Sequence, residues 1–105
     1  MIFTAAGLVN QSEIETAVRK VERDFAPDVV RIRHSFGEDS LGAPAIFFRI
    51  LIRDEAAPVD HLKELAQPVS KALMNETRTN ENDLNAYFRY RRVSEQQKLA
   101  DPAWN

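Results

Sequence analysis

Apolar and polar residues follow two different periods along this chain, and each period predicts a different kind of element. Residues 45–53 are nearly unbroken in apolar β-forming residues, interrupted only by arginines, so we expect them to form the central strand of a small sheet. Successive side chains of a strand point to opposite faces. One face of this strand therefore carries Ile46, Phe48, Ile50 and Ile52, and the other carries Phe47, Arg49, Leu51 and Arg53.

Two further segments alternate with a period of two and predict two more strands. Residues 30–36 place Val30, Ile32, His34 and Phe36 on one face and Arg31, Arg33 and Ser35 on the other. Residues 84–91 place Leu84, Ala86, Phe88 and Tyr90 on one face and Asn85, Tyr87, Arg89 and Arg91 on the other. The turn-forming residues 37–44 predict that the first two strands form an antiparallel hairpin with a long acidic loop.

The first helix is predicted by a start signal, an apolar stripe and a proline. Ser12 followed by Glu15 indicates a capping box, in which each side chain satisfies a free backbone donor. Pro27 is expected to end the helix, because the residue before a proline avoids helical torsions. The stripe at helical spacing consists of Ile14, Ala17, Val18, Val21 and Phe25.

A second helix is predicted from Pro58, a residue that is well tolerated in a first turn. Its apolar stripe contains Val59, Leu62, Leu65, Ala66, Val69, Ala72 and Leu73. Pro68 removes one helical hydrogen bond, so we expect a kink or a break there. Residues 75–83 are polar and predict an exposed loop. Ser94 is expected to cap a short helix that Pro102 stops.

The order helix, strand, strand, helix, strand predicts an α+β two-layer sandwich with the helices on one face of a mainly antiparallel sheet. If residues 2–8 also form a strand, the order becomes the ferredoxin-like βαββαβ. At 105 residues we expect a single domain, with residues 1–10 as a loose N-terminal segment and residues 94–105 as a C-terminal tail.

The composition of the chain argues against several classes of protein. The net charge of −2 and a pI near 5.7 argue against coating nucleic acid or anionic membrane by bulk charge. The chain has no cysteine, which excludes disulfides and thiolate metal sites and suits a reducing cytoplasm. Neither a signal peptide nor a membrane-spanning stretch is indicated. We therefore expect a soluble, cytoplasmic protein without a membrane partner.

The three predicted strands place arginines and aromatic residues together on the face away from the helices. Guanidinium groups bind carboxylates and phosphates bidentately and stack on aromatic rings, and such residues are enriched at protein interfaces. We expect this face and the tail to bind a protein partner or a second copy of the chain. The alternative is single-stranded nucleic acid, with arginines on phosphates and rings on bases. A third possibility is that the tail itself covers the face with its tryptophan. The candidate residues are Arg31, Arg33, Phe47, Arg49, Leu51, Arg53, Tyr87, Arg89, Arg91 and Trp104.

Catalysis is poorly supported by the sequence. His34 and His61 stand far from any cluster of ligand-forming residues, and we expect no metal. The pairs Glu38-Asp39 and Asp54-Glu55 flank opposite ends of the central strand, so they do not share a substrate. No phosphate loop or nucleophile elbow is present. We predict no enzyme activity, no catalytic residue and no cofactor.

Three short motifs carry a resemblance to a known family. They are Phe36-Gly-Glu-Asp39, Pro44-Ala-Ile-Phe-Phe-Arg-Ile50 and Ser94-Glu-Gln with Asp101-Pro-Ala-Trp104. With these motifs the chain resembles a family of short uncharacterised bacterial proteins, some of which are encoded beside a small helical HEPN-like protein. The resemblance implies a pairing of the toxin–antitoxin or accessory type. It supplies no catalytic residues.

Overall fold

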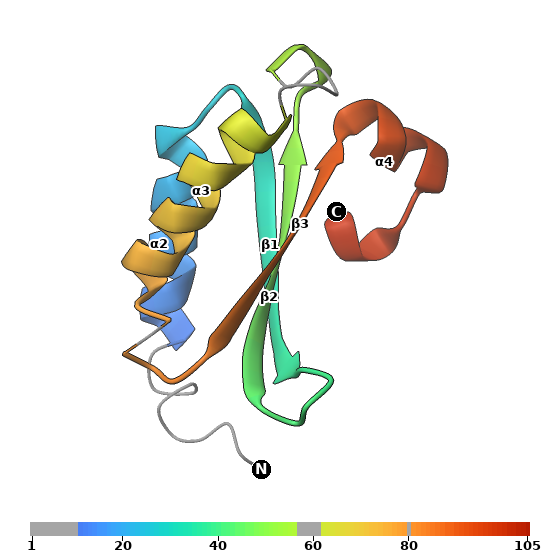
Figure 1. The fold of residues 1–105 in the computed structure, drawn as a ribbon. Coiled ribbons are helices and arrows are strands. Elements are labelled where there is room, and N and C mark those ends of the chain that lie inside the picture. The colour runs from blue at the N-terminus through green and yellow to red at the C-terminus, as the bar shows by residue number, and fades with distance from the viewer. Residues whose placement is uncertain (1–10, 57–61, 80) are drawn as a thin grey trace.

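The computed structural model describes residues 11–56, 62–79 and 81–105 (Figure 1). Helices α2 and α3 lie on one side of the sheet, and α4 and the C-terminal turn lie on the other (Figure 1). The predicted roles of residues 1–10, Pro58, Val59 and His61 fall outside the described residues. The elements are α2 (Gln11–Asp24), β1 (Val29–Glu38), β2 (Pro44–Ile52), the 3-10 turn η1 (Asp54–Ala56), α3 (Leu62–Thr77), β3 (Asn85–Arg92), α4 (Val93–Leu99) and the 3-10 turn η3 (Pro102–Trp104).

Strand β2 is the middle strand of a three-stranded sheet with the order β1-β2-β3. It pairs antiparallel with β1 and parallel with β3. The parallel pairing arises because α3 carries the chain back along the sheet to the end where β2 began. The α+β class and the predicted order of elements are therefore confirmed, whereas the sheet is mixed rather than mainly antiparallel.

The ferredoxin-like alternative does not describe this sheet. In that split βαβ arrangement another strand separates the two parallel strands. Here β2 and β3 are direct neighbours, paired from Ala45↔Asn85 to Ile52↔Arg92. Residues 2–8, which the alternative required as a strand, lie outside the described residues.

The apolar face of the sheet packs against α2 and α3 as the periodicity predicted. Phe48 is 1% exposed, and its ring stacks on that of Phe88 with the centroids 5.3 Å apart. The helices contribute Ile14, Val18, Val21, Val69 and Leu73, and β2 contributes Ile46, Phe48, Ile50 and Ile52. Because this cluster buries one face of each strand, the other face points away from α2 and α3.

A bulge at the start of β1 makes one predicted burial wrong. Val30 is 44% exposed, whereas Val29 is buried at 2%. The register shifts between Val29, which pairs with Ile52, and Arg31, which pairs with Leu51. Val30 is the extra residue of the bulge. Because side chains alternate with a period of two, one inserted residue places Val29 on the buried face and Val30 on the exposed one.

Both predicted serine caps are wrong. Ser12 lies inside α2, and Glu15 forms an ion pair with Arg19 at 3.2 Å. At α4 the N-cap is Arg92, whose backbone N–H donates to Glu95, and the N–H of Ser94 donates to Asp54. This helix follows β3 without a loop, so the cap falls on the last strand residue.

The ends of α3 and α4 also differ from prediction. Of the kink or break expected at Pro68, the break is wrong, because α3 runs through Pro68 as one helix. The helix continues to Thr77, whereas a polar loop was expected from residue 75. Thr77 and Thr79 are buried rather than exposed. The buried Thr77 hydroxyl donates a hydrogen bond to the Leu73 carbonyl. Helix α4 ends before Ala100, which adopts a left-handed conformation with φ 48°, two residues ahead of Pro102.

Two side chains of α2 bond to the main chain of β1 at Ile32. Arg19 donates to the Ile32 carbonyl at 2.7 Å, and the Ile32 N–H donates to Glu22 at 2.8 Å. Main-chain groups at a sheet edge are otherwise open to pairing with another chain. The helix therefore both buries the apolar face and closes this part of the edge. No helix in the described ranges has the length and apolar character that a bilayer crossing demands.

We predict that Phe48→Ala destabilises the protein by about 3–5 kcal/mol, because it leaves a cavity between the sheet and the helices. Val30→Ala, at the exposed bulge, should change the free energy of unfolding by less than about 0.5 kcal/mol. Urea unfolding followed by circular dichroism compares the two variants. Equal losses would contradict the assignment of the two faces.

Candidate functional site

The sheet face opposite α2 and α3, called here the open face, is organised in rows across the three strands. The pairing brings together Arg31, Leu51 and Arg91 in one row, Arg33, Arg49 and Arg89 in the next, and Ser35, Phe47 and Tyr87 in the third. Five of the six predicted arginines thus share one face. Arg53 lies beyond the end of β2 and pairs with Asp28, through two donors at 2.9 and 2.7 Å.

The chain's own tail lies across part of this face. The side chain of Arg49 donates from Nε to the Ala103 carbonyl at 2.8 Å, and that of Arg33 donates to the Asn105 carbonyl at 2.8 Å. Arg31 donates to the Trp104 carbonyl at 3.4 Å. Three arginines on two strands therefore bind three consecutive main-chain carbonyls, and the possibility that the tail covers the face is realised at this end.

Trp104 anchors the tail. Its side chain is buried at 2% exposure, and the guanidinium carbon of Arg91 lies 4.3 Å from its ring centroid. Arg91 also donates to Gln96 at 2.7 Å, and Gln96 donates to the Asp101 carbonyl at 2.7 Å. Leu51, in the same row as Arg91, is 5% exposed. The predicted candidates Arg31, Leu51, Arg91 and Trp104 thus form an internal contact.

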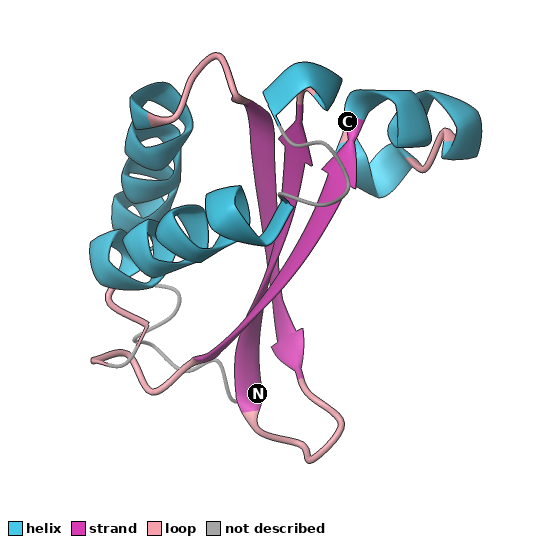
Figure 2. Ribbon diagram, turned by 45° about the horizontal axis from the view of Figure 1, so that its top comes forward, coloured by secondary structure: helices cyan, strands magenta, loops and turns pink. Residues whose placement is uncertain are grey.

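The other end of the open face is uncovered. Phe47 and Tyr87 stack with their ring centroids 5.4 Å apart, and Tyr87 is 42% exposed. Leu41, in the hairpin loop between β1 and β2, is 91% exposed. Arg89 is exposed and has no hydrogen-bond or ion-pair partner among the described residues. Leu41, Phe47, Tyr87 and Arg89 are called the hairpin-end patch below, and Figure 2 shows the hairpin at the end of the sheet away from α4.

Asp39 ties the hairpin loop to β3. Its carboxylate accepts hydrogen bonds from Asn85 at 3.0 Å and Tyr87 at 2.8 Å, and from the backbone N–H groups of Leu41 and Ala43. These bonds, chiefly that from Asn85, lower the pKa of Asp39 to about 2, and the bond to Asp39 raises the pKa of Tyr87. The loop acid is thus a fixed negative charge beside the patch.

Sequence reasoning missed the role of Asp39 and the exposure of Leu41. The sequence analysis considered Asp39 only as one of two acidic pairs that flank the central strand. The signal that indicated more was its position two residues before Leu41, since an aspartate in a turn commonly accepts from the N–H two residues on. The contacts with Asn85 and Tyr87 depend on the pairing of β3, which local sequence does not specify.

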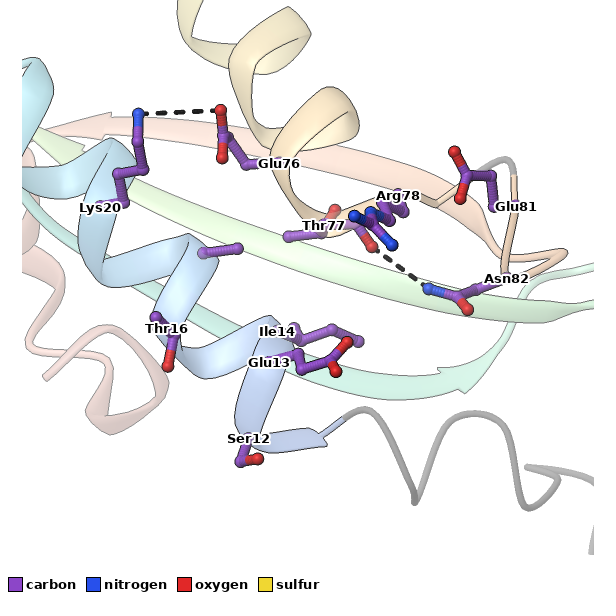
Figure 3. A pocket seen from close by; sticks show the side chains of 11 residues that line it. Ser12, Glu13, Ile14, Thr16, Lys20, Glu76, Thr77, Arg78, Glu81 and Asn82 are labelled. Carbon is purple, nitrogen blue, oxygen red and sulfur yellow. Dashed lines mark hydrogen bonds and ion pairs between the residues drawn. The ribbon is translucent and has the colours of Figure 1, made fainter.

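A pocket of about 590 Å³ lies between the start of α2 and the end of α3 (Figure 3). Its lysine, Lys20, is already paired with Asp24 at 2.7 Å and lies 3.7 Å from Glu76. Asn82 donates to the Thr77 carbonyl at 3.2 Å (Figure 3). His34 lies elsewhere, against α2, where burial lowers its pKa. In the described ranges no three potential metal ligands group together.

Comparison with known proteins gives no family model, no curated protein and no solved structure that matches the chain. The resemblance to the short bacterial family therefore stays a prediction. The case for a function rests on the open face itself.

We predict that Arg91→Gln loosens the tail. It removes the guanidinium from the Trp104 ring and breaks the link to Gln96, which should lower the free energy of unfolding by about 1–3 kcal/mol. Trp104 is the chain's single tryptophan, so its fluorescence should shift to the red as the ring meets water. Arg89→Gln, on the same strand and face, is the control and should leave the emission unchanged. Unchanged emission in Arg91→Gln would contradict the described docking.

Asp39 should make the protein sensitive to acid. Its folded pKa of about 2 lies below its ordinary value of 3.8, so its stabilising contribution is complete above about pH 4 and is lost as the pH falls towards 2. Asp39→Asn should therefore lose less stability between pH 4 and 2 than the wild type. Urea unfolding across this range measures the difference, with Glu38→Gln as the control for loss of a loop charge. Parallel curves for wild type and Asp39→Asn would refute the role.

Proposed function

We propose that this protein is a non-enzymatic interaction module that binds a protein partner through the hairpin-end patch. The observation that carries the proposal is that Leu41, 91% exposed, lies in the loop that Asp39 fastens beside Tyr87, itself 42% exposed. Arg89, which has no hydrogen-bond or ion-pair partner in the described part of the chain, adds a guanidinium to the same end of the face. Exposed apolar and aromatic side chains with arginine are the residues that protein interfaces favour in their centres.

The patch is held in place before any partner arrives. Phe47 lies between Tyr87 and Gly37, because a Cβ built on Gly37 would meet the Phe47 ring at 3.2 Å. Asp39 fixes the Tyr87 hydroxyl, and its bonds to the Leu41 and Ala43 N–H groups fix the loop. Side chains that are already ordered lose less conformational freedom on association, so a small patch of this kind supports specific binding.

The tail restricts where the partner binds. Arg31, Leu51, Arg91 and Trp104 contact one another or the tail, so our proposal assigns them to holding the tail and assigns the partner to the uncovered end. The sequence prediction treated the whole face as one surface. The proposed interface is the smaller part that the tail leaves open.

Single-stranded nucleic acid is the second candidate, and the positive charge of Arg33, Arg49 and Arg89, none of which pairs with an aspartate or glutamate of the described residues, favours it. Two features weigh against it. Phe47 and Tyr87 each use one ring face on the other, which leaves less aromatic surface for bases. Asp39 keeps its charge beside Tyr87, where a phosphate chain following the rings would meet it.

The partner is either a second copy of the chain or the product of a neighbouring gene. The resemblance to proteins encoded beside a HEPN-like protein makes an antitoxin-like or accessory role our working proposal. Any such neighbour is therefore the first protein to mix with this one. Sedimentation of the chain alone tests the second-copy alternative.

We predict that Leu41→Ser weakens association with that partner, or with itself, by about tenfold or more, as expected for a central apolar contact. Leu99→Ser is the matched control, because Leu99 is also exposed, at 62%, but lies on α4 outside the patch. Isothermal titration measures the affinity for a neighbour and sedimentation velocity measures self-association. A chain that stays monomeric and binds no neighbour would end the proposal, as would equal effects of the two substitutions.

A further inference from the structure

The middle row of the open face sets three arginines side by side across the sheet. Arg33 on β1 pairs with Arg49 on β2, which pairs with Arg89 on β3. Neighbouring strands lie about 4.8 Å apart, so the three Cα atoms span about 10 Å. Like charges directly opposite one another destabilise a sheet. The three residues are called the arginine row below.

No aspartate or glutamate side chain of the described residues lies within 4.0 Å of the arginine row. Arg33 donates to the main-chain oxygen of Asn105, and Arg49 donates to the Ala103 carbonyl, which is neutral and satisfies a hydrogen bond without cancelling charge. Asp101 acts on Arg49 from a distance, but its ion pair is with Arg91, at 3.9 Å. Burial lowers the pKa of Arg49, and the charges of Arg33 and Arg89 act in the same direction.

Several other arginines of the chain pair with carboxylates. Arg19 pairs with Glu15 and Glu22, Arg53 with Asp28, and Arg92 with Glu95. The chain carries a net charge of −2, so carboxylates are not scarce. Arg23 and Arg78 also have no carboxylate partner among the described residues, but they stand apart, whereas the row sets three such arginines side by side across the sheet.

We infer that the arginine row binds the carboxylates of an acidic segment on the protein partner. The guanidinium group matches a carboxylate with two parallel donors, and no acceptor among residues 11–56, 62–79 and 81–105 uses the donors of Arg89. Two neighbouring acidic side chains on a helix lie about 5–6 Å apart, close to the spacing of adjacent arginines in the row. The inference rests on the proposed function and names the chemistry of the partner.

The surroundings favour an acidic protein segment over nucleic acid. The row is flanked on one side by the tail and on the other by the row of Phe47 and Tyr87, with Leu41 beyond. A peptide places carboxylates on the row and an apolar side chain against the rings and Leu41. A nucleic acid strand of similar length brings a phosphate at every step and meets the carboxylate of Asp39.

The test measures binding of a fluorescein-labelled hexaglutamate peptide to the full chain by anisotropy at constant ionic strength. A hexaglutamine peptide tests the need for charge, and a hexathymidylate strand tests nucleic acid. The variants are Arg89→Gln and the double variant Arg33→Gln with Arg89→Gln. Arg23→Gln, an exposed arginine of α2, is the matched control for loss of one positive charge.

We expect hexaglutamate to bind the wild type and hexaglutamine not to bind. Arg89→Gln should weaken hexaglutamate about tenfold, as removal of one charge-assisted contact implies. Arg23→Gln should change the affinity less than about twofold, since it alters only long-range charge. Circular dichroism confirms that each variant is folded.

Absence of hexaglutamate binding would overturn the inference, as would equal weakening by Arg23→Gln. Tighter binding of hexathymidylate, lost with the same row variants, would also overturn it and assign the row to nucleic acid. These outcomes are separate from those of the proposed function. If Leu41→Ser abolishes partner binding and the row variants do not, the proposed interface is supported. The inference that the partner supplies an acidic segment is then wrong.

Discussion

The register of β2 against its two neighbours determines what the open face can do. A slip of one residue in either pairing would exchange the two faces of a strand, and Arg49 would enter the apolar layer under α2 and α3. Ile46, Phe48, Ile50 and Ile52 are each at most 1% exposed, and burying one such side chain stabilises a fold by about 1.5–3 kcal/mol. The arginines are therefore positioned by the core on the far side of the strand.

The tail forms a second, smaller packing layer on that face. Trp104 and Leu51 are buried, yet neither belongs to the main apolar cluster beneath the helices. Arginine suits this position because its long side chain covers apolar surface while its donors reach main-chain carbonyls. This explains why an arginine-rich face holds a buried tryptophan: the guanidinium groups satisfy the carbonyls of residues 103–105, which the indole brings down onto the sheet.

Sequence patterns predicted those features that depend on local periodicity. The three strands, the face on which five of the six candidate arginines lie and the stripes of α2 and α3 follow from periods of 2 and 3.6. The bulge at Val30 did not follow, because an inserted residue leaves the alternation of the later residues intact and shows only in the pairing with β2. The parallel pairing of β3 depends on the path of α3 across the sheet, which no local signal states.

For the candidate site too, the sequence predicted what depends on local alternation and missed what depends on strand pairing and on the packing of the tail. Alternation placed Arg33, Arg49 and Arg89 on one face, but their arrangement in a single row depends on two registers, one for each strand pair. The covering of half the face depends on where a tail with one tryptophan packs. Asp39 escaped prediction because its partners, Asn85 and Tyr87, are more than forty residues away in sequence.

The two halves of the open face differ in what they contribute to folding, and this difference points to function. At the tail end Arg31, Arg49 and Arg91 bind the tail or pack on its tryptophan, so these residues are accounted for by stability. At the hairpin end, Leu41 has little contact with the protein and Arg89 faces other arginines without a counter-ion. Neither arrangement stabilises the isolated chain, and residues that act against stability are commonly those used in binding or catalysis. Our proposal therefore assigns this end to binding, because the side chains of Leu41 and Arg89 contribute little to the fold of the described residues.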